Sequence, residues 1–176
     1  MYIRKANIYD SMGIAKVHVD VWKSAYVGII DNVYLNELSF EKRKKSWMNQ
    51  LNKGSLIYVA ESKNGEIVGF ATPCVERNNH KDYKGEISAL YVLDKYQGQG
   101  VGRDLLVKSA KALRNSNIKS LIVWVLKDNP SCKFYESLGG VAKESKLTRI
   151  GEKDYVSIGY VWEDINILAD HTCDSE

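Results

Sequence analysis

Three glycines at alternate positions form the segment of the sequence that is best suited to bind a ligand. They lie within Tyr96–Arg103, between a predicted strand and a predicted amphipathic helix. Glycine lets the backbone approach a ligand closely and adopt positive φ values. The unpaired N–H groups of a first helical turn, beside the positive end of the helix dipole, favour phosphate. The segment therefore predicts a phosphate or pyrophosphate site formed by Gln97, Gly98, Gln99, Gly100, Val101, Gly102 and Arg103.

Two common phosphate-binding motifs do not fit this segment. A dinucleotide fingerprint that starts at Gly98 and Gly100 needs its third glycine at position 103, which is arginine, and the segment lies past the middle of the chain. A P-loop needs Lys-Ser or Lys-Thr after its last glycine, and neither is present. A glycine-rich turn that binds nothing is the structural alternative.

A second motif lies further along the chain, in the stretch Asn129–Gly140, which contains Phe134-Tyr135. It resembles the second signature of the GNAT superfamily of N-acetyltransferases, an asparagine followed by Phe-Tyr on a short helix. The spacing Gln97-x-x-Gly100-x-Gly102, after the strand ending at Leu90–Val92, resembles the acyl-CoA loop of the same superfamily. The resemblance covers the chain from Tyr2 to about Trp162.

Periodicity and turn residues place these motifs on an ordered series of elements. Apolar positions predict a helix from Ile14 to Ala25 with a break near Gly28, and Asn64-Gly65 predicts a β-hairpin turn. Further elements are expected as a first strand at Tyr2–Ala6, a helix at Phe40–Leu51, strands at Ser55–Glu61, Glu66–Val75, Glu86–Leu93 and Leu121–Leu126, a helix at Ser131–Leu138, and strands at Val141–Leu147 and Tyr155–Trp162.

The resemblance implies an α+β fold. Its expected core is a mixed, mostly antiparallel central sheet of six to seven strands, with helices on both faces and one splayed parallel strand pair. That pair would be Glu86–Leu93 and Leu121–Leu126. Residues 1–166 would form a single domain, and 167–176 would be a loose C-terminal tail.

The co-substrate that the resemblance implies is acetyl-CoA. Backbone groups of Leu90, Tyr91 and Val92 would pair with the pantetheine arm like an added strand, and the Val92 N–H would bind the oxyanion. Asn129 would either hydrogen-bond that arm or cap the helix at Ser131. Arg103 or Lys95 would either touch phosphate or remain a surface charge.

Two catalytic residues follow from the resemblance. Tyr135 matches the tyrosine that protonates the departing thiolate, and a phenol stays protonated at neutral pH; packing in the core is its alternative. Glu86 lies where some relatives place a general base, with a surface carboxylate as its alternative. The superfamily has Arg or Gln at the first loop position, so Gln97 fits the pattern but lacks the cation that Arg would place near phosphate. Many members have Phe after the glycine of the second motif, where this chain has Gly140.

The acceptor side of the site is less well defined. In this fold the first two helices and the last hairpin form the acceptor pocket, which nominates Trp22 and Tyr26 as substrate-binding residues. His18, Tyr34, Tyr155 and Tyr160 are further candidates. Aromatic walls suit an apolar or cationic acceptor. Simple packing of Trp22 and Tyr26 against the sheet is the alternative.

Composition narrows the class of protein. The chain has 176 residues and a net charge of +3, and its longest unbroken apolar run, Leu121–Leu126, is far shorter than a membrane span requires. Three scattered cysteines form neither a disulfide framework nor a metal pair, no metal-binding cluster is expected, and the start of the chain lacks a signal peptide pattern. We therefore expect a cytoplasmic protein. The basic run Lys42–Lys45 is interpreted as a solvated helix face, so a nucleic acid partner is not expected.

The sequence thus predicts an enzyme, an N-acetyltransferase that moves an acetyl group from acetyl-CoA to a primary amine of a small molecule or peptide by direct attack in a ternary complex. One alternative is a non-catalytic acyl-CoA-binding sensor or partner module. A second is an RNA- or protein-directed acetyltransferase. Homodimers are common in the superfamily, so a homodimer is one expectation for the assembly, although no segment of the sequence marks an interface.

Overall fold

A seven-stranded sheet forms the centre of the protein in the computed structural model, which describes residues 1–171. Its strand order is β1-β2-β3-β4-β5-β7-β6. All neighbouring strands are antiparallel except β4 and β5, which are parallel. The strands are β1 (Tyr2–Lys5), β2 (Tyr58–Glu61), β3 (Ile67–Val75), β4 (Gly85–Val92), β5 (Leu121–Leu126), β6 (Val141–Ile150) and β7 (Lys153–Trp162). This arrangement confirms the predicted fold class.

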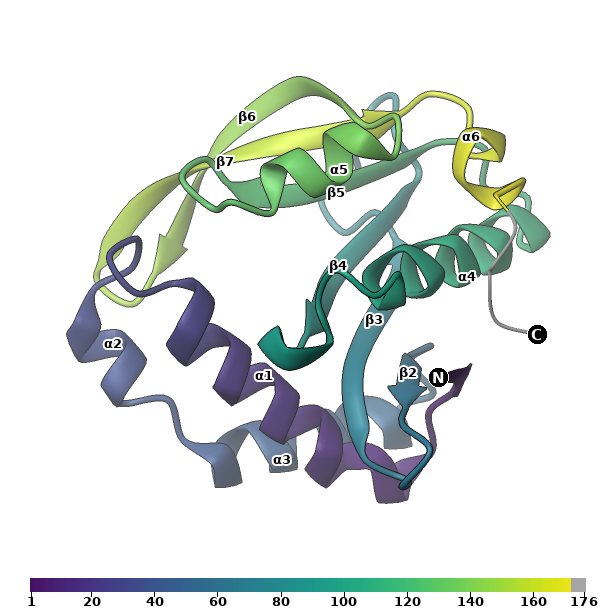
Figure 1. The fold of residues 1–176 in the computed structure, drawn as a ribbon. Helices are drawn as coiled ribbons and strands as arrows, with labels where there is room; N and C mark the ends of the chain where they lie inside the picture. The colour runs from purple at the N-terminus through teal and green to yellow at the C-terminus, as the bar shows by residue number, and fades with distance from the viewer. Residues whose placement is uncertain (172–176) are drawn as a thin grey trace.

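Six α-helices in the described residues cover both faces of the sheet. Figure 1 shows α1 and α3 on one side of β3 and β4, α4 on the other side, and α5 lying over β5 and β7. The helices are α1 (Ser11–Ala25), α2 (Asn32–Asn36), α3 (Phe40–Asn52), α4 (Val101–Asn115), α5 (Cys132–Ser137) and α6 (Asn166–Ala169). None of the helices in residues 1–171 combines the length and the apolar character needed to cross a membrane.

Local turn chemistry explains several of the boundaries. Gly65 adopts φ +79° in the β2–β3 turn, and Gly28 adopts φ +76° after α1, as their predicted roles require. The pairing of β3 with β4 shifts register between Ala71 and Pro73, because proline has no N–H to donate to the ladder. Pro73 therefore marks a bulge directly beside the middle of β4.

The parallel strands β4 and β5 pair at one end only. Their register contains Gly85 with Leu121 and Glu86 with Ile122, and no later residue of β4 pairs with β5. Beyond these pairs the two strands diverge (Figure 1). The predicted splayed pair is therefore confirmed, and its open end includes Leu90–Val92.

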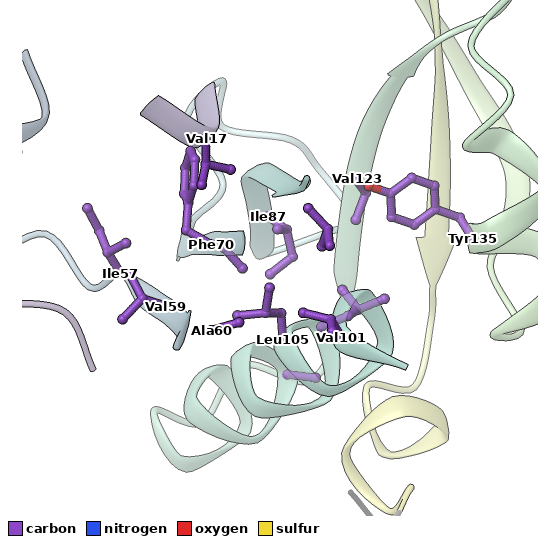
Figure 2. Packing of buried hydrophobic residues seen from close by; sticks show 14 of the residues in the cluster. Val17, Ile57, Val59, Ala60, Phe70, Ile87, Val101, Leu105, Val123 and Tyr135 are labelled. Atoms are coloured by element: carbon purple, nitrogen blue, oxygen red, sulfur yellow. The ribbon is translucent and has the colours of Figure 1, made fainter. Parts of the chain in front are cut away.

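The buried core fills the space between the sheet and its helices (Figure 2). Helix α4 contributes Val101, Leu105 and further buried residues at helical spacing, and α1 contributes Ile14 and Val17 from the other side. An added Cβ on Gly69 would lie 3.2 Å from Leu105, so this glycine of β3 lets α4 pack closely on the sheet. The close fit fixes the position of the N-terminus of α4 relative to β4.

The C-terminal end of the domain extends beyond residue 166. The predicted loose tail, 167–176, is wrong for residues 167–169, because α6 is helical and Leu168 and Ala169 are completely buried. Arg114 of α4 donates a hydrogen bond to Asn166 and forms an ion pair with Asp170. Residues 172–176 of that prediction lie outside the described part of the chain.

Candidate active site

The N-terminus of α4 presents main-chain N–H groups without a capping side chain. Gly100 is the N-cap residue with φ +82°, and Gly98 adopts φ +70°. Within residues 1–171, no side chain forms a capping hydrogen bond at this helix end. The N–H groups of Val101, Gly102 and Arg103 precede the first intrahelical bond, which runs from the Asp104 N to the Gly100 O. Helix dipole and donors together fit a diphosphate.

Side chains of the same segment stabilise its shape. Gln97 Nε2 donates to the Val92 O at 3.0 Å and to Asp94 Oδ1 at 3.1 Å, and Gln99 Nε2 donates to the Lys95 O at 2.9 Å. Both glutamines therefore bind the loop itself, and a cation at position 97 is not needed to hold this conformation. Among the two predicted cations, Lys95 pairs with Glu66. The Arg103 Nη2 would lie 3.5 Å from a Cβ on Gly100, so its guanidinium is next to the N–H groups.

The first turn of α4 also contacts α5. An added Cβ on Gly102 would lie 3.3 Å from the Phe134 ring, which is tighter than an ordinary van der Waals contact. Gly102 thus lets the aromatic pair Phe134-Tyr135 approach the α4 N-terminus. The two motifs of the sequence lie side by side for this reason.

The backbone of β4 faces the gap at alternate residues. Leu93 N donates to the Val68 O, and Val92 pairs with Gly69, so in this antiparallel ladder the N–H and C=O of Val92 and Leu90 point away from β3. They point to the side where β5 has diverged. Tyr91 differs from its prediction, because its peptide groups point toward β3.

Tyr135 lies at the wall of this gap. Its side chain is 5% exposed, its ring lies 5.0 Å from the ring of Phe134 and 5.9 Å from that of Tyr160, and burial raises its pKa. Figure 2 shows the hydroxyl end of the ring directed toward Val123 of β5. A phenol with a raised pKa holds its proton at neutral pH, as an acid for a leaving thiolate requires.

Asn129 makes the contact that one of its two predicted roles requires, and binding of the coenzyme arm by its Nδ2 stays a prediction. Its Oδ1 accepts a hydrogen bond from the Ser131 N at 2.8 Å, so the side chain caps the turn that leads into α5. The Asn129 side chain also interacts with the Tyr26 hydroxyl, as its effect of lowering the Tyr26 pKa shows. Asn129 therefore joins α5 to the acceptor side of the site.

The Gly-Gly end of α5 has a packing reason. Gly139 adopts φ +82°, and an added Cβ on Gly140 would lie 2.8 Å from both the Trp162 ring and the Tyr135 O. Trp162 Nε1 donates to the Leu138 O at 2.9 Å. The indole of Trp162 therefore occupies space that a side chain at position 140 would need.

Aromatic residues from α1, α2 and β4 meet at the acceptor side. The Trp22 ring lies 4.9 Å from the Tyr26 ring and 6.0 Å from the Tyr34 ring. Burial is the main cause that raises the pKa of Tyr26, and neighbouring Tyr91 and Tyr135 raise it further. Tyr26 is thus close to both Trp22 and Tyr135. We define the aromatic cluster as Trp22, Tyr26, Tyr34 and Tyr91. Through Tyr26 this cluster adjoins the gap between β4 and β5.

The other aromatic candidates have different positions. The Tyr155 hydroxyl accepts from the Asp31 N at 3.0 Å and ties β7 to the start of α2. The Tyr160 hydroxyl donates to Glu136 and its ring stacks on Tyr135, so it lies on the α5 side and not in the acceptor wall. The prediction that Tyr160 is a candidate for the acceptor pocket is therefore corrected.

His18 is a buried neutral histidine. Trp47 Nε1 donates to His18 Nδ1 at 3.2 Å, and the His18 ring lies 5.5 Å from Trp22 and 5.4 Å from Tyr91. Burial, together with the charge of Arg43, lowers its pKa to about 3. His18 therefore supports the aromatic cluster from behind and carries no charge at neutral pH.

Glu86 is held in an ion pair. Its side chain is 1% exposed, Arg77 Nη2 contacts Oε1 at 2.6 Å, and Arg77 Nε donates to Oε2 at 3.0 Å. It lies at the paired end of β4 and β5, opposite Ile122. Because Arg77 contacts both oxygens, protonation of Glu86 would give up part of this ion pair, so the geometry disfavours Glu86 as general base, and that role stays a prediction.

Arg43 is the residue that sequence reasoning missed. Its guanidinium carbon lies 5.9 Å from the Trp22 ring centroid, and Nη2 donates to the Tyr34 hydroxyl at 3.4 Å. The basic run is therefore not uniformly solvated. Arg43 and buried Trp47 are four residues apart on α3, a spacing that places both on one helix face and was the available signal. Residues 1–171 contain no group of His, Cys, Asp and Glu that could hold a metal ion.

Known proteins with similar sequences and structures agree with this geometry. The model of the acetyltransferase (GNAT) family matches residues 20–140. The N-acetyltransferase YuaI of Bacillus subtilis, itself described as uncharacterized, is 35% identical over 166 residues, which cover 94% of this chain and 95% of YuaI. The probable N-acetyltransferase Rv2775 of Mycobacterium tuberculosis is 30% identical over 140 residues, 76% of each chain.

Two solved structures share the fold. One is the PaiA N-acetyltransferase of Thermoplasma acidophilum in complex with coenzyme A, with TM-score 0.73, 23% identity, and coverage of 89% of this chain and 96% of that one. The other is YncA of Salmonella typhimurium with acetyl-CoA, with TM-score 0.69, 19% identity, and coverage of 100% and 98%. The chain belongs to the acetyltransferase (GNAT) family and is an acetyl-CoA-dependent N-acetyltransferase, as its two motifs predicted.

Proposed function

We propose that this chain transfers the acetyl group of acetyl-CoA directly to a primary amine of a small molecule in a ternary complex. The observation that carries the proposal is that three features lie together at one place in the structure. The uncapped N-terminus of α4, the outward-facing peptide of Val92 and the protonated phenol of Tyr135 all border the open end of the β4–β5 pair. Acetyl-CoA, when bound, supplies the reactive thioester.

The main chain would hold the coenzyme at two points. The N–H groups of Val101, Gly102 and Arg103 fit its diphosphate, and the neighbouring Arg103 guanidinium adds positive charge. The peptide groups of Leu90 would pair with an amide of the pantetheine arm as an added strand does, while the C=O of Val92 accepts from Gln97 and its N–H stays available for the acetyl oxygen. PaiA and YncA, whose structures contain coenzyme A and acetyl-CoA, support this assignment.

Two groups would act on the transferred acetyl group. The Val92 N–H donates to the carbonyl oxygen as negative charge develops on it, and Tyr135 Oη gives its proton to the departing sulfur. The amine reacts in its neutral form and releases its proton to solvent at the half-buried aromatic cluster. Glu86 keeps its ion pair with Arg77 and is assigned no proton transfer.

A pair of matched variants tests the role of Tyr135. Tyr135→Phe removes only the hydroxyl, and we expect thiol release to fall by about 100-fold, in the range of general acid catalysis, with unchanged coenzyme affinity by calorimetry. Tyr160→Phe removes the hydroxyl of the stacked neighbour and should leave turnover near that of the wild type. Equal turnover in wild type and Tyr135→Phe would remove Tyr135 from the chemistry.

The same assays separate the alternative functions. Coenzyme binding without thiol release for any amine would indicate a sensor or partner module. An RNA-directed enzyme would need the Lys42–Lys45 run as an exposed basic patch, but Arg43 is half-buried against Trp22. Salt-dependent binding of RNA by the purified chain would favour that alternative instead.

A further inference from the structure

We propose that the amine acceptor carries a carboxylate close to its reacting nitrogen, as a free amino acid does, and that Arg43 binds this carboxylate beside the aromatic cluster. This inference rests on the proposed acetyl transfer and names the class of its acceptor. Three observations carry it: the missing counter-ion of Arg43, the position of its guanidinium, and the size of the adjoining cavity.

Arg43 differs from every other arginine of the chain. Each of the others lies within ion-pair distance of a carboxylate: Arg4 with Asp10, Arg77 with Glu86, Arg103 with Asp104, Arg114 with Asp170 and Arg149 with Asp154. Arg43 forms no ion pair with any Asp or Glu of residues 1–171. Its one side-chain hydrogen bond is the 3.4 Å contact with the Tyr34 hydroxyl.

A half-buried guanidinium without a counter-ion has N–H donors and a positive charge that can bind an anion. Arginine has five N–H donors in a planar fork that matches the two oxygens of a carboxylate. One donor is used here, and the ring of Trp22 lies against the cation. Partial removal from water strengthens attraction for an anion. The geometry is therefore that of a receptor for a planar anion.

The guanidinium acts on the aromatic cluster and not only on solvent. Burial lowers the pKa of His18 and raises that of Tyr91, and the charge of Arg43 acts on both residues by lowering the pKa of each; their rings lie 5.4 Å apart. Tyr34 contacts Arg43 and Trp22 together. A carboxylate on Arg43 would thus lie at one side of the cluster, while Tyr26, at its other side, adjoins Tyr135.

A cavity adjoins Arg43 on the side of the guanidinium that faces α2 and α3. It has a volume of about 300 Å³ and lies between α2 and α3, with Tyr34 and Arg43 in its wall. Its charged lining residues are Glu37, Lys42 and Arg43, so cations outnumber the single carboxylate. This volume is at the lower end of ligand pockets, which favours a small molecule over a peptide. Polyamines, with several ammonium groups, would be repelled by Arg43.

Pairs of amines that differ only in the carboxylate test the proposal. Thiol release from acetyl-CoA is measured with phenylalanine against phenethylamine and with leucine against 3-methylbutylamine. We expect the wild type to favour the amino acid of each pair by at least tenfold in kcat/KM. Arg43→Gln should reduce kcat/KM for the amino acids by about 10- to 100-fold, as loss of a charged hydrogen-bonded contact does, and leave the decarboxylated amines unchanged.

Control variants distinguish recognition from folding. Lys45→Gln removes an exposed cation of the same helix that lies outside the cavity lining, and it should change neither class of acceptor. The KM for acetyl-CoA should be the same in all variants. A preference of the wild type for the decarboxylated amines, or an equal loss for both classes in Arg43→Gln, would overturn the proposal.

A binding measurement separates failure of this inference from failure of acetyl transfer. Calorimetric titration with phenylalanine in the presence of coenzyme A needs no turnover. If phenylalanine binds in an Arg43-dependent way but no thiol is released, the proposed carboxylate site is supported and the proposed acetyl transfer is refuted. Absence of both binding and turnover with the amino acids, while phenethylamine is acetylated, would refute the carboxylate site and retain the transfer.

Discussion

Acidification should destabilise this protein through one buried histidine. His18 is 6% exposed, its Nδ1 accepts the Trp47 indole N–H, and burial lowers its pKa from the ordinary 6.5 to about 3. Between these two values the unfolded chain binds a proton at this residue and the folded chain does not. Stability therefore rises with pH across this interval and is lost as pH falls.

The size of the effect follows from the pKa difference. Each pH unit below 6.5 costs about 1.4 kcal/mol until the folded pKa is reached. At pH 5 the loss is about 2 kcal/mol relative to pH 8, which corresponds to a decrease of about 4–8 °C in Tm for a domain of this size. Protonation would also place a cation against Trp22 and Tyr91, which ring the acceptor side of the site.

The measurement compares urea unfolding at pH 8 and pH 5 for wild type and His18→Asn. Asparagine cannot titrate here, and its Oδ1 can accept the Trp47 N–H in place of Nδ1. The free energy of unfolding of the wild type should fall by about 2 kcal/mol more than that of the variant. An equal fall in both proteins would show that His18 does not remain neutral in the folded state, and the structural reasoning would be refuted.

Two further predictions concern the loop and the ion pair. Gly100→Asp should abolish measurable coenzyme binding in calorimetry, whereas Gly100→Asn, which is isosteric with it but neutral, should retain part of that binding. The two variants share the strain at φ +82°, and only Asp adds negative charge at the diphosphate site. Equal affinities in the two variants would contradict an electrostatic site. Arg77→Gln should lower the free energy of unfolding by about 3–5 kcal/mol, since it strands the carboxylate of Glu86. Glu86→Gln should cost only about 1–2 kcal/mol, because Arg77 is 60% exposed and can be solvated, and the pH profile of turnover should be unchanged; a shifted profile would restore Glu86 as the base.

The fold could be predicted because its signals are local. Asn64-Gly65 marks a turn by backbone preference, the apolar run Leu121–Leu126 marks a strand covered on both faces, and Gly139 ends a helix with positive φ. Each of these elements occurs as expected. The short helix α6 was missed because its burial depends on α4, which lies about fifty residues earlier in the chain and supplies Arg114 as partner.

The sequence names the backbone groups of the candidate site and the aromatic side chains of Tyr135, Trp22 and Tyr26, but not the pairings of its charged side chains. Glycine spacing predicts the α4 N-terminus, and the resemblance implied the β4 backbone at Leu90–Val92, of which the strand alternation turns only Leu90 and Val92 outward. Pairings between charged side chains could not be predicted in this way. Arg77 meets Glu86 across a loop, and Arg43 lies on Trp22 of another helix, so both pairings depend on how α3 and the β3–β4 loop pack.

The peptide of Val92 connects the two halves of the proposed site. Its N–H faces the gap where the acetyl oxygen would lie, and its carbonyl accepts the hydrogen bond from Gln97 Nε2 at 3.0 Å. Gln97 in turn precedes the glycines that present the N–H groups of α4. One side-chain amide therefore fixes the distance between the diphosphate grip and the oxyanion donor. A long, flexible coenzyme gains little from either contact alone, because ordering it costs conformational entropy. In the proposed complex, two contacts held at a constant separation would recover that cost and place the thioester beside Tyr135. The position of the Gln97 amide would then matter more than a positive charge at residue 97.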